Sequence, residues 1–381
     1  MSRIFNIIIM LCICSFISGA QSLCEIGKYD LINGADISVR PSYVMPTHGL
    51  YSGYNDLEKP VRSALSLHAR YSMHISDKET LPELFSKAYQ GVGLSLQTFF
   101  AHELTGTPVG LYLYQGLPFL NLTDRLSLGY EWNFGLSAGW KKNAAVGSSF
   151  NAYVNVGVLF SYAFGCGHIL RFGPEYTHFS NGDTCFPNGG ANTLGLSFTL
   201  AREFMNNVST DRKAPMEYHD YRGMTYDIIA YGAWRADRTV SDRLYIINRK
   251  FPLAGLQFNP LYHTGPYLSF GPSLDLMYDG SANLYGHVRN EDESVTYQIP
   301  DLSSQLAAGI SGRAELRMPI FAVNLGAGIN LLKSGEDMRR FYAIFALKGF
   351  VTDRFFLHVG YRMSSLRYTH NLMFGLGFRI G

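Results

Sequence analysis

Apolar residues alternate with small or polar residues along many stretches of this chain. From Leu126 to Trp140 every even position is apolar, while the odd positions hold serine, glycine, asparagine or glutamate. The same alternation runs through residues 92–98, 152–162, 268–278, 321–331 and 372–380. A period of two places the apolar side chains on one face of a β-strand. The pattern therefore predicts an all-β chain.

The second face of these strands indicates a membrane barrel rather than a soluble sheet. A soluble sandwich carries many lysines and glutamates on its outer face, whereas here the second face holds glycine, serine, asparagine and single charges. Charged residues make up only 16% of the 381 residues, and apolar residues 47%. Apolar side chains toward lipid and small polar ones in a narrow lumen are typical of a transmembrane β-barrel. A soluble lipocalin-like barrel, with its apolar face inward, is the alternative.

A polar, turn-rich connector at residues 206–222 divides the chain into halves of similar length. The first half, 21–205, contains about eight predicted strands, near residues 36–45, 63–73, 91–101, 107–117, 125–140, 150–162, 168–180 and 192–204. The second half, 223–381, contains a similar number, and its last segment looks like the C-terminal strand of outer-membrane barrels. The antiparallel strands are expected to form either two tandem barrels or one wider barrel.

The two halves also resemble each other near their ends. Residues 175–180 are followed by a strand at 194–198, and residues 360–365 by a similar strand at 374–378. This similarity indicates either a duplication or independent patterning of two end strands. The second half has Met363 where the first has His178. We therefore expect the second half to be non-catalytic.

Residues 1–20 predict a secretory signal peptide that is cleaved near Ala20. Arg3 precedes an apolar run that ends at Ile17, and three small residues follow it. A transmembrane anchor is the alternative, but the run is shorter than the ~20 residues that a spanning helix needs. The mature chain is therefore expected outside the cytoplasm.

Three cysteines remain after such a cleavage. Cys166 falls in the short turn before the predicted strand 168–180, and Cys185 falls in the long loop after it. The apolar band of a membrane barrel, about 25 Å tall, separates those two ends. Any disulfide is therefore expected to join Cys24 to Cys166.

The formal net charge of +2 is close to balance and implies neither nucleic acid nor a strongly anionic partner. No cluster of residues has the spacing of metal ligands. We therefore expect no metal and no cofactor.

Catalytic residue types converge between His178 and Asn192. His178 and Ser180 stand two residues apart, so on a strand they share one face at about 6–7 Å, and the imidazole can act as base for the hydroxyl. Both are in phase with the apolar face of their strand, which predicts that they point outward. Asn192 is in phase with Leu194 on the next strand, where it can orient the imidazole as the third member of a triad.

Two nearby residues receive other roles. Glu175 occupies an odd position that turns it toward the lumen, where Arg171 is expected to pair with it. Pro174 cannot donate to a sheet ladder and suggests a bulge.

Polar groups that face lipid cost about 1–3 kcal/mol each, so the outward triad needs a functional reason. An ordinary wet loop above the apolar band is the alternative.

A family resemblance is carried by these same residues. His178-x-Ser180-Asn181, with a Pro-Asn-x-Gly element at residues 187–190, resembles the lipid A 3-O-deacylase (PagL) and acyloxyacyl hydrolase family of outer-membrane barrels. That family has a His/Ser/Glu triad, and this sequence has Asn192 at the position of the glutamate. The His/Ser/Asn set also resembles outer-membrane phospholipase A. The resemblance covers mainly residues 30–204.

The resemblance implies a serine esterase of the bacterial outer membrane that removes an acyl chain from lipid A or lipopolysaccharide. Ser180 would be the nucleophile, His178 the general base, and Asn181 or the Gly182 N–H would hold the oxyanion. With a periplasmic N-terminus and eight strands, the turn after the seventh strand faces the outside, so the site is expected at the outer leaflet. A phospholipase A-like enzyme, which would use one twelve-stranded barrel and calcium, and a non-catalytic porin or structural barrel are the alternatives.

Overall fold

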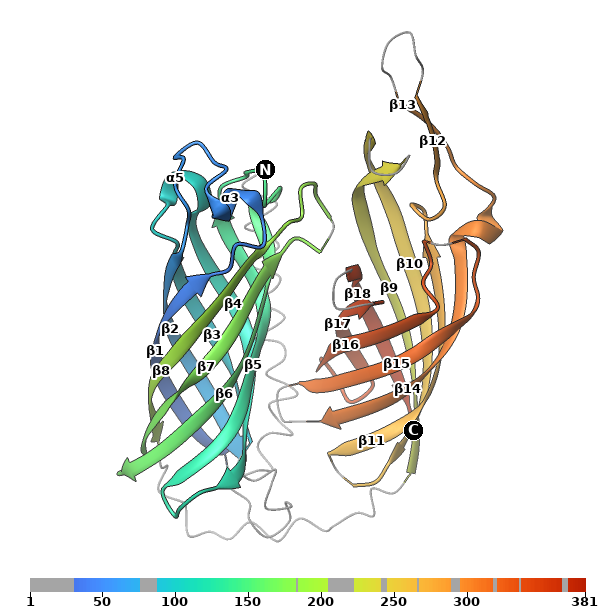
Figure 1. Ribbon diagram of the computed structural model, residues 1–381. Helices are drawn as coiled ribbons and strands as arrows, with labels where there is room; N and C mark the ends of the chain where they lie inside the picture. Colours follow the sequence, from blue (N-terminus) through green and yellow to red (C-terminus); the bar gives the residue numbers. More distant parts are fainter. Residues whose placement is uncertain are drawn as a thin grey trace. The chain divides into compact units, whose positions relative to one another are not determined.

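The computed structural model shows two closed barrels of antiparallel strands, with eight strands in each (Figure 1). This confirms the predicted all-β barrel class and decides for two tandem barrels over one wider barrel. The structure describes residues 31–75, 88–182, 184–204, 223–240, 245–265, 267–288, 295–317, 321–335, 337–364 and 369–381. The predicted signal peptide, Cys24, the connector and Ser365 lie outside these residues.

The first barrel is a continuous meander that closes where its first strand pairs with its last. Its strands are β1 (Leu31–Val44), β2 (Ser63–Ile75), β3 (Tyr89–Thr98), β4 (Gly106–Asn121), β5 (Leu126–Trp140), β6 (Phe150–Gly165), β7 (His168–Ser180) and β8 (Ala191–Phe204). Closure of β1 on β8, with Ser38 opposite Thr199, leaves no unpaired sheet edge in this barrel. Each strand overlaps the range expected from the sequence.

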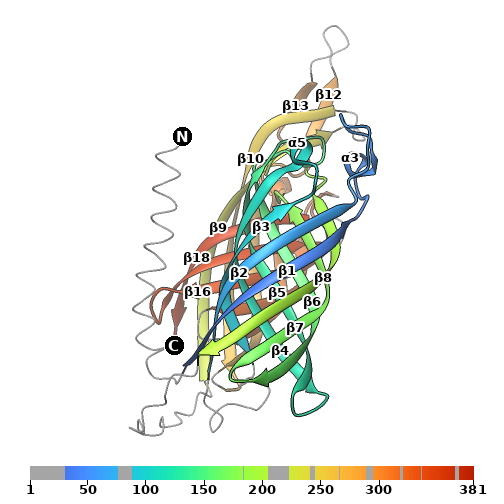
Figure 2. The ribbon, with the colours of Figure 1, turned by 90° about the vertical axis from the view of Figure 1, so that its left-hand side faces the viewer.

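One end of the first barrel carries the four connections that lead from an odd-numbered strand to the next even-numbered strand. It is the end at which β1 and β7 finish, and we call it the far end. The short helices α3 (Gly49–Ser52) and α5 (His102–Thr105) lie there, and the strands run obliquely between the two ends (Figures 1 and 2).

The second barrel closes in the same way, through β9 and β18. Its strands are β9 (Gly223–Val240), β10 (Tyr245–His263), β11 (Leu268–Asp279), β14 (Leu306–Arg317), β15 (Ala322–Leu332), β16 (Phe341–Phe350), β17 (Phe355–Met363) and β18 (Thr369–Ile380). The connection between β11 and β14 contains a separate hairpin, β12 (Tyr285–Val288) with β13 (Val295–Gln298), and the 3-10 turn η2 (Leu302–Gln305).

Apolar side chains cover the outside of both barrels. In the first barrel Ile37 is 64% exposed and Leu194 54% exposed, and in the second Leu274 is 57% exposed. Their neighbours along each strand point inward and are polar, which is the arrangement expected for lipid outside and a polar lumen. This excludes the lipocalin-like alternative. Among the described residues no helix is long and apolar enough to cross a bilayer.

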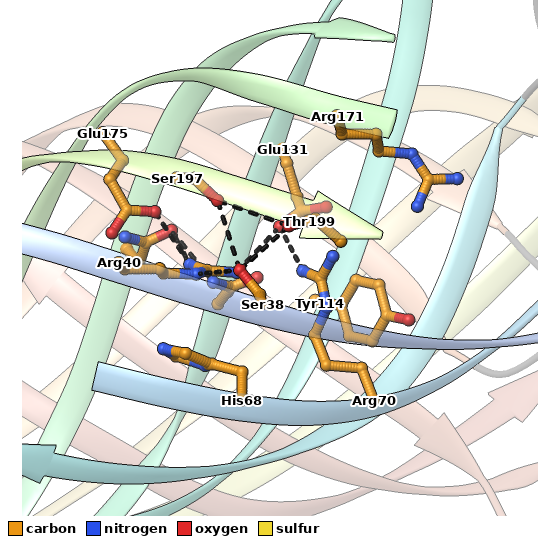
Figure 3. A network of polar contacts seen from close by, with 12 residues as sticks. Ser38, Arg40, His68, Arg70, Tyr114, Glu131, Arg171, Glu175, Ser197 and Thr199 are labelled. Atoms are coloured by element: carbon orange, nitrogen blue, oxygen red, sulfur yellow. Dashed lines mark hydrogen bonds and ion pairs between the residues drawn. The ribbon is translucent and has the colours of Figure 1, made fainter. Parts of the chain in front are cut away.

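The lumen of the first barrel is filled by a network of buried charges (Figure 3). One oxygen of Glu131 accepts hydrogen bonds from both Arg40 and Arg70. Arg70 also contacts Asp36, and Arg40 Nη1 donates to Glu175 Oε2 at 2.8 Å. Each charge thus lies beside an opposite charge, as a low-dielectric interior requires.

Glu175 points into the lumen as predicted, but its predicted partner was wrong. Its carboxylate binds Arg40, while Arg171 lies over the Tyr89 ring at 4.2 Å and 3.8 Å from Asp36. The inward phase of both residues followed from the period of two. Their pairing depends on which strands face each other across the lumen, and the period carries no information about that.

Pro174 does not produce the predicted bulge. It lies opposite Leu196 in an unshifted ladder with β8. On its other side, the pairs Gly157–Glu175 and Phe160–Phe172 keep one register with β6 across the proline. The residue is therefore accommodated inside the strand, and the phase upstream of the site is unchanged.

We predict that Glu131→Gln destabilises the first barrel by about 3–5 kcal/mol, because it leaves two buried guanidinium groups without their shared carboxylate. Unfolding by urea in detergent micelles measures the change. Asp124→Asn, in an exposed turn, is the matched control and should leave the midpoint unchanged. Equal midpoints for Glu131→Gln and the control would show that the network does not stabilise the fold.

Candidate active site

His178, Ser180 and Asn192 lie together at the far end of the first barrel. His178 and Ser180 lie within the last three residues of β7, and Asn192 is the second residue of β8. His178 is directly opposite Asn192 in the antiparallel ladder. All three residues are thus in regular strands rather than in the wet loop considered as an alternative.

Phe179 fixes the direction of its two neighbours. Its side chain is 1% exposed and packs inside the barrel, with ring centroids 4.9 Å from Trp140 and 5.3 Å from Tyr153. Successive side chains of a strand point to opposite faces. Because Phe179 is held inward, His178 and Ser180 are held on the outer face.

A hydrogen bond between His178 and Asn192 defines the state of the imidazole. The Asn192 Oδ1 atom lies 2.7 Å from His178 Nδ1. The same oxygen accepts the Tyr176 hydroxyl at 2.6 Å, and the amide nitrogen donates to Thr47 Oγ1 at 2.9 Å. This orientation of the amide makes Oδ1 the acceptor, so Nδ1 carries the hydrogen and Nε2 has the free lone pair.

The site is covered although it belongs to the outer face. Ser180 is only 6% exposed and Asn192 9%, whereas Leu194, in the same phase, is 54% exposed. The segment before α3 crosses Asn192, because the Met45 N–H donates to the Asn192 carbonyl at 2.9 Å. The candidate triad is therefore covered by the connections at the far end and is not openly exposed on the outer surface of the barrel.

Asn181 organises the loop that follows Ser180. Its side-chain nitrogen donates to the carbonyls of Cys185 and Pro187, at 2.7 and 3.2 Å. Its backbone N–H donates to Asn188 Oδ1 at 3.0 Å. The backbone N–H and the side-chain nitrogen of Asn181 thus both donate hydrogen bonds within the loop. Gly182, the other residue expected to support an oxyanion, is buried and has a φ of 62°.

The connection between β5 and β6 braces this loop. Gly147 N–H donates to Pro187 O at 2.8 Å, and Gly190 N–H donates to Ala145 O at 3.1 Å. Val146 and Asn188 form a bridge between these two backbone contacts. The loop is therefore held on both sides of its Pro-Asn-x-Gly element.

Three supporting residues were not predicted from the sequence. Tyr176 was recognised only as an apolar member of the outward phase, and its hydroxyl could have been considered from that phase. Thr47 lies 145 positions from Asn192 in the chain, and no local pattern connects them. Asn188 was noted as part of a motif, without its contact to the Asn181 N–H.

Cys166 and Cys185 lie beyond opposite ends of β7, as predicted, and neither forms a disulfide with another described residue. The pairing of Cys166 with Cys24 stays a prediction, because Cys24 is outside the described residues. Within the described part of the chain, no group of three or more His, Cys, Asp or Glu residues is arranged to hold a metal ion.

Comparison with solved structures returned large outer-membrane proteins at low similarity. The siderophore receptor PirA from Acinetobacter baumannii matches with 7% identity and a TM-score of 0.23, over 87% of this chain and 68% of that chain. PirA from Pseudomonas aeruginosa matches with 7% identity and a TM-score of 0.24, over 92% and 80%. CdiB from Acinetobacter baumannii matches with 11% identity and a TM-score of 0.19, over 91% and 60%. These scores are too low to support any shared property.

A search of curated protein sequences found no significant match. Family profiles, by contrast, match both barrels. The profile of lipid A 3-O-deacylase (PagL) matches residues 65–201, and the profile of the acyloxyacyl hydrolase C-terminal domain matches residues 224–381. Together the two profiles span most of the chain, and each falls on one of the two barrels. The chain therefore belongs to the family of PagL lipid A deacylases and acyloxyacyl hydrolases.

Proposed function

We propose that the first barrel is a serine esterase of the outer membrane that hydrolyses an acyl ester of lipid A or lipopolysaccharide. The observation that carries this proposal is the 2.7 Å hydrogen bond from His178 Nδ1 to Asn192 Oδ1. In the neutral imidazole this bond keeps the hydrogen on Nδ1 and leaves Nε2 free to act as a base, on the strand that also presents Ser180. Membership of a lipid A deacylase family supports the choice of substrate.

The reaction follows from these protonation states. Ser180 Oγ attacks the ester carbonyl while His178 Nε2 takes the hydroxyl proton. The imidazolium then gives this proton to the departing alcohol oxygen, which leaves the acyl group on Ser180. Water attacks the acyl-enzyme with His178 again as base, and the fatty acid is released. Asn192 remains neutral throughout and acts by holding the imidazole in one tautomer.

The oxyanion of the tetrahedral intermediate is assigned to the Gly182 N–H rather than to Asn181. The Asn181 N–H already donates to Asn188, and its side chain holds the loop. Gly182 follows in a left-handed backbone conformation that glycine adopts without strain. A single well-placed backbone donor of this kind contributes about 3–4 kcal/mol to transition-state stabilisation.

The surroundings of the site favour a substrate that is already in a membrane. Leu194, Leu196 and Phe198 extend from Asn192 along the outer face of β8 and are 54%, 49% and 48% exposed. An acyl chain that lies along this apolar stripe brings its ester toward the far end. By contrast, the lumen of the first barrel contains a packed charge network, so the porin alternative is disfavoured for this barrel.

A phospholipase A-like activity is the second candidate, and one observation favours it. The residue that orients His178 is an asparagine, as in the His/Ser/Asn set of outer-membrane phospholipase A. Two observations oppose it, since the first barrel has eight strands and no metal-holding group of carboxylates is found in the described part of the chain. The deacylase therefore remains the principal proposal.

The second barrel is proposed to be non-catalytic. Its strand β17 is in the phase expected from the sequence, with Leu357 40% exposed and His358 1% exposed. Met363, which replaces the base of the first barrel, ends this strand. Without a neighbouring base a serine hydroxyl is a weak nucleophile at neutral pH.

Ser180→Ala is expected to abolish release of fatty acid, because it removes the nucleophile and only one oxygen atom from a folded strand. Mass spectrometry of lipid A incubated with purified protein measures the loss. A fluorophosphonate probe should label Ser180 alone in the unmodified chain. Full activity of Ser180→Ala, or labelling of Ser365, would contradict the proposed assignment of the two barrels.

The supporting residues are expected to act in a graded way. Asn192→Ala should lower kcat by less than His178→Ala, since it removes the orienting group and leaves the base. Tyr176→Phe should lower kcat by about two- to tenfold, because it removes one hydrogen bond worth about 1 kcal/mol. Inactivation by Glu175→Ala together with a silent Asn192→Ala would show that the orienting residue lies in the lumen instead.

Gly190→Ala is expected to lower kcat at least tenfold, because a Cβ there would lie 2.5 Å from Phe179 O and 3.4 Å from His178 Cε1. Gly165→Ala is the matched control. It has a similarly positive φ of 99° with nothing within 4 Å of the added carbon, so it costs backbone strain without touching the triad. Equal activities of the two variants would show that the close approach to His178 is unimportant.

A further inference from the structure

The two barrels differ in the balance of their buried charges. In the first, the fully buried acids Asp36, Glu131 and Glu175 match the cations Arg40, Arg70 and Arg171. In the described part of the second, the buried acids are Asp227, Asp275, Asp279 and Glu315, and the buried cations are Arg235, Arg313, Lys348, Arg362 and Arg379. Among the buried side chains that the structure describes in this barrel, the cations thus outnumber the acids by one.

The unbalanced cation is Arg362. Lys348 and Arg379 share Asp227 and Glu315, Arg313 Nη2 lies 2.6 Å from Asp275, and Arg235 lies 2.8 Å from Asp279. These pairs are the salt bridges of the described lumen. Arg362 is 1% exposed and donates to the neutral amide oxygen of Asn330 at 2.8 Å. Its guanidinium also stacks 3.8 Å above the Tyr342 ring centroid.

Several polar atoms around Arg362 have no hydrogen-bond partner. Its Nε and Nη1 are both buried and unpaired. The Tyr231 hydroxyl lies beside the guanidinium of Arg362 and has no hydrogen bond of good geometry to any other described residue. An isolated buried cation costs several kcal/mol unless a counter-charge or water satisfies it. The guanidinium of Arg362 thus retains buried donors that an acceptor group in the lumen could satisfy.

Two arginines lie next to Arg362 at the rim of the barrel, in a loop that also contains Asp337. Asn330, which holds Arg362, donates through its side-chain nitrogen to Arg339 O at 2.6 Å and through its backbone to Arg340 O at 2.7 Å. The side chains of Arg339 and Arg340 are exposed. Cations at a narrow entrance attract anions toward the interior.

We propose that Arg362, with Tyr231 and Asn330, forms an anion-binding site inside the second barrel for a ligand that bears a phosphate group. A phosphate offers several acceptor oxygens and a negative charge, which suits the unpaired guanidinium donors of Arg362 and the neighbouring phenol. Arginine is well suited to phosphate because its donors are fixed in one plane. The site is independent of the proposed esterase, because Ser180 and His178 belong to the other barrel.

Isothermal titration calorimetry on the full chain in detergent micelles tests the site, with inorganic phosphate and phosphatidic acid as two separate probes. The unmodified protein is expected to bind at least one of them saturably, and Arg362→Met should weaken that binding at least tenfold. Tyr231→Phe keeps the shape of the ring and should weaken binding of the probe about threefold or more. This variant replaces Arg362→Met in the test if Arg362→Met does not fold. Arg354→Met, in the exposed turn at the opposite end of β17, is the matched control and should bind normally.

The two probes distinguish the sources of the phosphate. Tighter binding of phosphatidic acid indicates a lipid headgroup, and binding of inorganic phosphate alone indicates a soluble anion. Ser180→Ala should bind either probe as the unmodified chain does, so failure of the esterase proposal leaves this test intact. Absence of saturable binding of both probes, or unchanged binding by Arg362→Met and Tyr231→Phe, would overturn the proposal.

Discussion

The constraint on which this structure depends is the two-residue period of a strand in a closed hydrogen-bonded ladder. Once the ladder closes, each side chain points either to the outside or into the lumen. Phe179 illustrates the consequence, because its insertion beside Trp140 leaves His178 and Ser180 on the outer face. The same rule sends Glu131 and Glu175 inward to neutralise arginines. A one-residue slip of β7 would bury the proposed base and expose a phenylalanine in its place.

Within that constraint, the candidate site is organised by hydrogen bonds in which no residue with a permanent charge takes part. Asn192 is held by Thr47 on one side and accepts from both His178 and Tyr176 on the other. A carboxylate in this position would stabilise the imidazolium by charge, whereas an amide stabilises only its orientation. The arrangement therefore depends on accurate placement of the amide, and the far-end segments that cover Asn192 provide it. This explains why Ser180 and Asn192 are nearly inaccessible although they belong to the outer face of their strands.

Much of the fold could be predicted from alternation alone, because the period of two is a local property. The range 168–180 predicted for β7 coincides with the observed strand, and its phase placed Glu175, His178 and Asn192 on the correct faces. What could not be predicted were contacts between distant segments. The pairing of Glu175 with Arg40 depends on how strands face each other across the lumen, and the contact between Thr47 and Asn192 depends on how a loop folds back. Such relations arise from closure of the barrel.

The way each barrel closes also has a consequence for synthesis of the chain. The first barrel has all its strands once Phe204 has been made, because β1 needs only β8 to complete its ladder. The second stays open until β18 has been made, since β9 pairs with this strand, which ends at Ile380. A frameshift or premature stop between Thr369 and Ile380 would thus open the second barrel, while the ladder that carries His178 and Ser180 would already be complete.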